Sequence, residues 1–425
     1  MPKPGQDAHA TPHQRHQLSP QEKHERKQRI LTHGAPSVTG SIAHAVVVKN
    51  GNLFFLTDDA GIAPLGGDHG FGLYYNDCRY LSGYDLRLAG ANLLCLISTA
   101  EPGYMAAFQL TNPDIRMPGG AFIRKEGIGV KWERLVDADN PALNELMTLE
   151  NYEAQDVAFP LTLTFEAGFE DVFAIRGLLP EKIGRSDEPK WKDGALSFVY
   201  EGADKLYRSL SVHFSPRPDS TVGTTARFDI RLRPGERKQL SISLVIAESE
   251  NANEALPDPH YRSDFHRIEA RLRRDCDEWV AGKTEIRTGS LLLNAIMDRS
   301  MRDLYALKSR LGDQEYFAAG VPWFATLFGR DSVITALQTL AYDPEIAAQT
   351  LRLLAKYQSR QRDEWRDAQP GKILHELRIG EMAKLGEIPH TPYYGTSDAT
   401  PLFLILVGRH AAWTGDLELF DELRD

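Results

Sequence analysis

Three short segments in the last third of the chain combine aromatic, basic and acidic side chains in a way that suits sugar binding. The first segment, GVPWFATLFGRDS, places Trp323 and Phe328 close to the step Arg330-Asp331. Aromatic rings can stack on the apolar face of a sugar, and Arg and Asp make directional hydrogen bonds to hydroxyl groups. The residue types equally allow a structural role, in which Asp331 caps the next helix and Trp323 packs in a core.

The second segment, GKILHELRIGE, concentrates His375, Glu376 and Arg378. It begins like the zinc motif HExxH, but residue 379 is Ile, so the second zinc ligand is missing. No other cluster of ligand-type residues argues for a metal, and we expect neither a metal nor a cofactor. A solvated charged loop is the slightly favoured alternative for this segment.

The third segment, PYYGTSDATP, contains Tyr394 and Asp398 and precedes the apolar run 402–407. A carboxylate at the mouth of a buried helix can be held protonated, because burial disfavours its charged form. A protonated carboxyl group at neutral pH can act as a general acid. Asp398 can also be the N-cap of the helix, and the two roles are compatible.

Composition excludes several classes of function. The 425 residues carry 49 basic and 59 acidic side chains, a formal net charge of −10. This balance disfavours binding to nucleic acid or to an anionic membrane, because both need a positive face. The three cysteines form no disulfide or metal pattern, and the N-terminus lacks the apolar core of a signal peptide. We therefore expect a cytoplasmic protein; the oligomeric state stays open.

Hydrophobic periodicity predicts two regions. Residues 1–37 are polar and predict a disordered tail. Over residues 38–255 apolar side chains alternate with other residues, which indicates short half-buried strands and an antiparallel β-sandwich. The runs that carry this alternation are residues 159–165, 196–200, 210–214, 228–232 and 240–246. Turn signals such as Lys192-Asp193-Gly194 separate them.

Helical periodicity replaces the alternation near residue 260. Residues 256–284 predict a linker helix, and residues 285–425 predict further helices without strands. The pattern from Leu293 to Leu307 marks one apolar face, and Asp343-Pro344 is a typical helix start. The run 402–407 is apolar all round and predicts a helix buried on most sides. An all-β region followed by an all-α region indicates separate domains.

Together the three segments resemble, in order and spacing, bacterial amylo-α-1,6-glucosidases, which are glycoside hydrolases of the glycogen-debranching type. Residues 70–82 (GFGLYYNDCRYLS) and 169–177 (FEDVFAIRG) resemble the N-terminal β-domain of the same proteins. The resemblance implies an (α/α)6 barrel and inverting hydrolysis of an oligo- or polysaccharide. It implies that Asp398 is the general acid. It also implies a substrate-binding set consisting of Trp323, Phe328, Arg330, Asp331, Glu376, Arg378 and Tyr394.

Inverting hydrolysis also needs a general base, which activates water on the opposite face of the sugar. The resemblance places this base beyond residue 425, and residues 285–425 hold only about five of the twelve helices of such a barrel. We therefore expect an incomplete (α/α)6 barrel that is inactive alone. Two alternatives stay open: an (α/α)6 glycosidase acting on trehalose or glucosylglycerate, and a non-catalytic carbohydrate-binding or scaffold protein.

Overall fold

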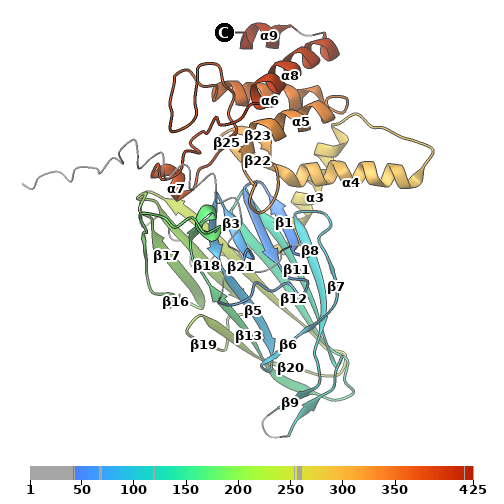
Figure 1. Ribbon diagram of the computed structural model, residues 1–425. Helices are drawn as coiled ribbons and strands as arrows, with labels where there is room; N and C mark the ends of the chain where they lie inside the picture. Colours follow the sequence, from blue (N-terminus) through green and yellow to red (C-terminus); the bar gives the residue numbers. More distant parts are fainter. Residues whose placement is uncertain are drawn as a thin grey trace, which may run out of the picture.

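The structure is a computed structural model with a strand-rich region and a helical region (Figure 1). It describes residues 42, 44–66, 69–117, 120–252, 254–255, 261–415 and 417–424. The predicted tail, residues 1–37, lies outside these residues. Within the described part of the chain, no helix is long and apolar enough to cross a membrane.

The largest sheet has nine antiparallel strands, in the order β15-β17-β18-β21-β12-β11-β8-β7, with β16 paired to β17. The strands are β7 (Leu94–Thr99), β8 (Met105–Thr111), β11 (Ile128–Asp137), β12 (Ala142–Asn151), β15 (Arg185–Ser186), β16 (Lys190–Lys192), β17 (Ala195–Glu201), β18 (Tyr207–Ser215) and β21 (Arg237–Ser249). The predicted turn at Lys192-Asp193-Gly194 joins β16 to β17. The alternating runs 196–200, 210–214 and 240–246 lie in β17, β18 and β21, as predicted.

Two five-stranded sheets complete the β region. One has the order β19-β20-β13-β5-β6 and the other β1-β2-β3-β4-β14. Their strands are β1 (Val46–Asn50), β2 (Leu53–Thr57), β3 (Gly72–Tyr75), β4 (Cys78–Leu81), β5 (Gly83–Leu88), β6 (Ala91–Asn92), β13 (Val157–Glu166), β14 (Glu170–Asp171), β19 (Ser220–Val222) and β20 (Thr225–Leu232). Alternate side chains from all three sheets meet in one core, which confirms the predicted antiparallel β architecture.

Shorter elements accompany the β region. The small hairpin β9–β10 stands apart from the three sheets, and α2 directly follows β14. Their bounds are β9 (Ile115–Arg116), β10 (Phe122–Ile123) and α2 (Val172–Ile175).

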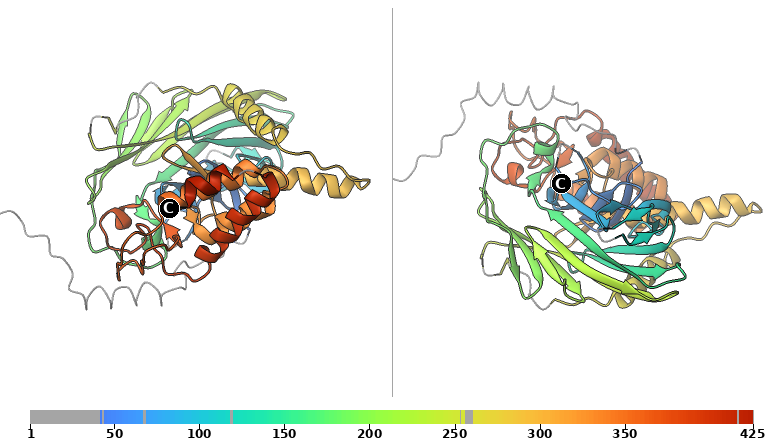
Figure 2. Two further views of the ribbon diagram at one scale, coloured as in Figure 1. Left: turned by 90° about the horizontal axis from the view of Figure 1, so that it is seen from above. Right: turned by 90° about the horizontal axis from the view of Figure 1, so that it is seen from below.

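The helical region covers one end of the β region, and in the view from above its helices lie over the strands while α4 extends to the side (Figure 2). Its helices are α3 (Phe265–Ala281), α4 (Leu291–Leu307), α5 (Gly329–Thr339), α6 (Pro344–Lys356), α7 (Glu381–Lys384), α8 (Ala399–Thr414) and α9 (Glu418–Leu423). Asp343 caps α6, as predicted, by accepting a hydrogen bond from the Glu345 backbone N–H at 3.0 Å.

The expectation that no strand follows residue 260 is wrong. Four short strands occur there: β22 (Lys308–Leu311), β23 (Gln314–Phe317), β24 (Leu327–Phe328) and β25 (Glu376–Leu377). They form two-stranded pairs that join the helices, and each is too short to produce a period-2 pattern in the sequence.

Two apolar helices are less completely buried than their residue types alone suggest. Helix α8 is half buried rather than enclosed, because Phe403 and Leu406 face the core while Leu404 and Ile405 are exposed. On α4, Leu293 and Ile296 are exposed, whereas Met301 is buried and Leu304 and Leu307 pack against the core of the helical region. Apolar periodicity reports which face could be buried, whereas burial itself depends on a neighbouring element.

The helical region is anchored to the β region by a buried ammonium group. Lys49 of β1 donates hydrogen bonds to the backbone oxygens of Ala306 at 3.1 Å and Lys308 at 2.8 Å, and to Ser309 Oγ at 2.9 Å. Burial lowers the pKa of Lys49 to about 7. Helix α3 adds an apolar contact with the β region, in a cluster of Tyr104, Leu135, Leu146, Phe265, Leu272 and Cys276.

Candidate active site

The three segments selected from the sequence meet in space. Strands β24 and β25 pair, with Phe328 opposite Glu376, which joins the first segment to the second. The Tyr393 backbone N–H donates to the Glu376 carbonyl at 2.9 Å, which adds the third segment. Gly329 permits this approach, because a Cβ atom there would lie 2.0 Å from the Leu374 carbonyl oxygen.

An ion pair between Arg330 and Asp398 connects the start of α5 with the start of α8. Arg330 lies in the first turn of α5, and its Nη1 donates to Asp398 Oδ2 at 3.0 Å. Asp398 is the N-cap of α8 but makes no side-chain capping hydrogen bond. Its carboxylate instead accepts hydrogen bonds from Arg330 and from the Thr396 hydroxyl. Asp331 lies beside this pair, with Oδ2 3.7 Å from Arg330 Nε.

Asp398 is not held protonated by burial, contrary to the physical argument made from the sequence. The side chain is 37% exposed. Its pKa lies below the ordinary value, chiefly because the Thr396 hydroxyl donates to the carboxylate, with a further contribution from Arg330. In this arrangement Asp398 is therefore ionised at neutral pH, and protonation requires a change in its partners.

Glu376 and Arg378 are buried and paired with each other. Arg378 Nε donates to Glu376 Oε1 at 2.5 Å, and Arg378 Nη2 donates to the Trp323 carbonyl at 2.6 Å. Burial acts to raise the pKa of Glu376, but the charges of Arg378 and His390 outweigh it, so the pKa lies below its ordinary value. Burial lowers the pKa of His390 to about 4. This geometry suits a structural role, in which Arg378 and Glu376 hold the surrounding segments together.

Two carboxylates from the β region also hold these segments in place. Asp77, between β3 and β4, accepts hydrogen bonds from Arg378 Nη1 at 2.8 Å and from the Ile379 backbone N–H at 3.0 Å. Asp171 accepts from the Met382 backbone N–H at 3.1 Å. Neither residue was a candidate from the sequence alone. Both lie in the segments 70–82 and 169–177, whose resemblance to a β-domain was the available signal.

The aromatic residues of the site differ in exposure. Phe328 and Tyr394 are buried, and the Tyr394 hydroxyl donates to the Tyr357 carbonyl at 2.7 Å. Trp323 is partly buried and packs against a cluster that contains Phe173 of α2. Phe324, which the sequence analysis did not select, is 47% exposed. Phe324 is therefore the more accessible aromatic ring in this segment.

No group of three or more potential metal ligands occurs among the residues that the structure describes. The side chains that meet at the site offer guanidinium, carboxylate, hydroxyl and aromatic groups. The described architecture is a strand-rich region followed by helices, with these groups gathered where α5 and α8 begin.

Known proteins share parts of this architecture. Residues 48–243 match the family described as the N-terminal domain of (some) glycogen debranching enzymes. No curated protein sequence matches the chain. Two solved structures share the fold over most of its length: a protein assigned as a kojibiose phosphorylase, from human microbiome, and a bacterial glucoamylase complexed with acarbose.

The two structural matches are similar in fold rather than in sequence. The first has 10% identity and a TM-score of 0.60, and covers 89% of this chain and 55% of that one. The glucoamylase has 13% identity and a TM-score of 0.53, with 92% and 59% covered. The chain therefore spans little more than half the length of either structure.

The family match covers slightly less than half of the chain and concerns its β region. Over most of its length the chain shares the fold of the two matching structures, with an antiparallel β-domain before the helices. This confirms the fold class and the debranching-type resemblance predicted from the sequence.

Proposed function

We propose that the protein binds a terminal glucosyl unit of an α-glucan at the junction of α5 and α8, and takes part in hydrolysis of an α-1,6-glucosidic bond with inversion. The observation that carries the proposal is the Arg330–Asp398 pair, held at 3.0 Å by segments 68 residues apart in the sequence. A guanidinium and a carboxylate at one exposed point provide both donors and acceptors for sugar hydroxyls. The exposed ring of Phe324, which lies in the same segment as Arg330, offers an apolar surface for a sugar ring.

Asp398 is the proposed proton donor to the leaving oxygen. In the free site Arg330 and Thr396 stabilise its ionised form. A sugar that takes over the Arg330 hydrogen bond and excludes water removes part of that stabilisation, which raises the pKa of Asp398 towards the range of a general acid. The proposal assigns no general base among the described residues, so Asp398 supplies only the acid half of the reaction.

The remaining site residues have separate proposed roles. Arg330 and Asp331 contact the glucosyl unit, and Trp323 lines the subsite. Glu376, Arg378, Phe328 and Tyr394 hold the contacting residues in place, which their burial supports. We expect the protein to act in the cytoplasm, because all three cysteines are free thiols.

Titration calorimetry of the 425-residue chain with isomaltose, maltose and trehalose tests this function. The proposal predicts that isomaltose binds about tenfold more tightly than trehalose. Tighter binding of trehalose would instead favour the trehalose-type glycosidase. Absence of binding by all three sugars at millimolar concentration would overturn glucosyl recognition.

A further inference from the structure

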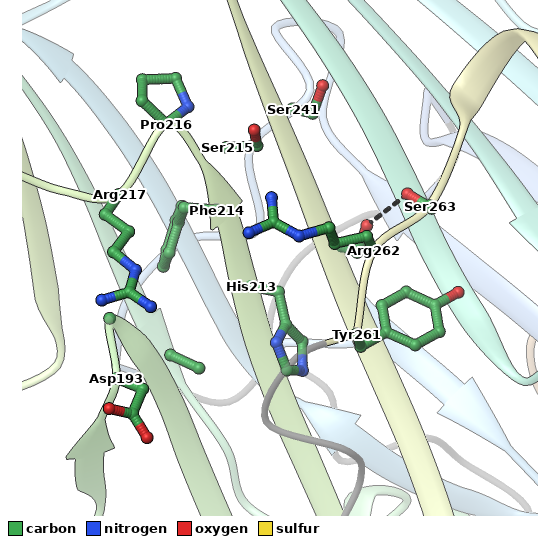
Figure 3. Close-up of a pocket in the computed structure, with 13 residues that line it drawn as sticks. Asp193, His213, Phe214, Ser215, Pro216, Arg217, Ser241, Tyr261, Arg262 and Ser263 are labelled. Carbon is green, nitrogen blue, oxygen red and sulfur yellow. Dashed lines mark hydrogen bonds between the residues drawn. The ribbon is translucent and has the colours of Figure 1, made fainter.

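A second pocket, of about 350 Å³, lies on the β region, and none of the three site segments lines it (Figure 3). Its walls are the ends of β18 and β21, the β16–β17 turn and residues 261–263. The side chains of Leu240, Ile242 and Leu244 point into the sandwich core, so the alternating Ser241 and Ser243 face outward into the pocket. Its volume falls at the small end of the range for small-molecule sites.

Two guanidinium groups enter the pocket from different walls. Arg217 follows β18, and Arg262 reaches over the sheet from the segment that precedes α3 (Figure 3). Neither side chain has a hydrogen bond or ion pair with another residue that the structure describes. Both guanidinium groups are therefore available as donors to a ligand.

Two hydroxyl groups add to the donor set. Ser215 and Ser241 are direct cross-strand partners of β18 and β21, and both line the pocket. Ser243 behaves differently, because it donates to Asn144 Oδ1 at 3.0 Å and so accepts from Ser263 at 2.7 Å. The protons of Ser243 and Ser263 are therefore used, while those of Ser215 and Ser241 have no partner among the described residues.

The charge of the lining favours an anion. Among the described residues that line the pocket, Asp193 is the only carboxylate, against the two guanidinium groups. The aromatic ring of Tyr261 lies 5.6 Å from the His213 ring, so it is not a free platform for stacking a neutral sugar. This positive site occurs on a chain whose net charge is −10. The net charge of the whole chain would therefore repel an anion, so any attraction at this pocket must come from its two guanidinium groups.

We propose that this pocket binds a sugar phosphate. The phosphate would accept charge-assisted hydrogen bonds from Arg217 and Arg262, whose planar groups suit phosphate oxygens, and hydrogen bonds from Ser215 and Ser241. The sugar ring would lie beside it, where Asp193 accepts hydrogen bonds from hydroxyl groups. The proposal is independent of the function assigned to Asp398.

Calorimetric titration of the 425-residue chain with glucose 6-phosphate, inorganic phosphate and glucose tests the pocket, in chloride buffer at about 0.15 M ionic strength, where charges more than about 8 Å apart are largely screened. Glucose 6-phosphate is expected to bind most tightly. Arg217→Ala and Arg262→Ala should each weaken it about 10- to 100-fold, the usual effect of losing a hydrogen bond to a charged group. Both side chains are exposed, so the variants should fold normally.

Arg231→Ala is the matched control, because it removes one exposed guanidinium from β20 outside the pocket. It should leave the affinity within about twofold, since exposed charges act weakly at a distance. Equal losses in Arg231→Ala and Arg217→Ala, or no binding of either phosphate compound, would overturn the proposal. Equal affinity for inorganic phosphate would overturn its sugar component, and competition by glucose alone would show a neutral-sugar site instead.

Discussion

The carboxylate of Asp77 lies 2.8 Å from Arg378 Nη1, although 301 residues separate the two in the sequence. This contact joins a turn of the β region to the loop that supports the proposed glucosyl site. Arg378 in turn contacts Glu376 and the Trp323 carbonyl. The β region therefore contributes directly to the geometry of the helical region's site.

Asp77→Asn tests how strongly this contact holds the two regions together. Asn tolerates the positive φ of 63° at this position but removes the charge opposite a buried guanidinium. We expect the free energy of unfolding to fall by about 3 kcal/mol, the scale of breaking a buried ion pair from one side. Urea unfolding followed by tryptophan fluorescence measures this loss.

Asp229→Asn is the control for Asp77→Asn. Asp229 pairs with Arg227 on the surface, where both side chains are about half exposed. Exposed pairs contribute at most about 1 kcal/mol. Equal losses of unfolding free energy in the two variants would show that the Asp77–Arg378 contact stabilises the fold no more than an exposed ion pair does.

Gly380→Ala tests the close approach of the two regions without changing any charge. A Cβ atom there would lie 2.5 Å from Asp171 Oδ2 and 3.0 Å from Asp77 Cβ. The backbone φ of −65° suits any residue, so only the lack of space opposes the substitution. We expect a loss of about 1–3 kcal/mol in urea unfolding. Gly289→Ala, with nothing within 4 Å of its Cβ position, should be nearly neutral, and a neutral Gly380→Ala would contradict the close contact.

The pH dependence of stability tests the burial of Asp171. Burial raises its pKa from 3.8 to about 7, against the effect of the hydrogen bonds from Phe173 and Met382. Between pH 4 and 7 the folded state holds a proton that the unfolded chain has released. This stabilisation is complete below about pH 4 and is lost as the pH rises to 7, with a slope of at most about 1.4 kcal/mol per pH unit.

Comparison with Asp171→Asn isolates this effect. Burial lowers the pKa of His390 from 6.5 to about 4, so His390 makes stability rise with pH between these two values. This contribution cancels in the comparison, because both proteins contain His390. The stability advantage of the unmodified chain over Asp171→Asn should shrink from pH 5 through pH 7 and level off near pH 8. An advantage that does not change with pH would mean that Asp171 is ionised throughout.

Arg330→Met should raise the pKa of Asp398. The ion pair with Arg330 helps to hold this pKa below its ordinary value, and Met retains the length of the side chain without its charge. Thr396→Val should raise it further, because the Thr396 hydroxyl is the largest cause of the shift. Carbon-detected NMR titration of labelled Asp side chains measures both changes, and an unchanged Asp398 titration in both variants would contradict the arrangement.

Local patterns predicted much of the fold but little of the contacts between regions. The strands of the sandwich and the Asp343 cap follow from short-range alternation and capping, which act within a few residues. The exposure of Leu404 and Ile405 depends on which elements pack nearby, so periodicity could not give it. The Asp77–Arg378 contact joins distant segments, and no local pattern encodes such a pair.

The candidate site was predictable to a similar degree. Residue types and the family resemblance selected Arg330 and Asp398, and the structure places them in contact. The same reasoning treated Asp398 as buried, whereas Thr396 and Arg330 keep it ionised. Ionisation state depends on neighbours in three dimensions, which the sequence does not specify.

Acarbose, the ligand of the matching glucoamylase structure, allows the most direct test of the proposed glucosyl site. Calorimetry of the 425-residue chain should show acarbose binding that Arg330→Ala weakens about tenfold or more, because a hydrogen bond from a charged group is lost. Asp398→Asn should retain affinity within about threefold. Arg409→Ala removes an exposed arginine about 16 Å further along α8 and should leave binding unchanged. Equal affinity of Arg330→Ala and Arg409→Ala, or no acarbose binding at all, would contradict the site.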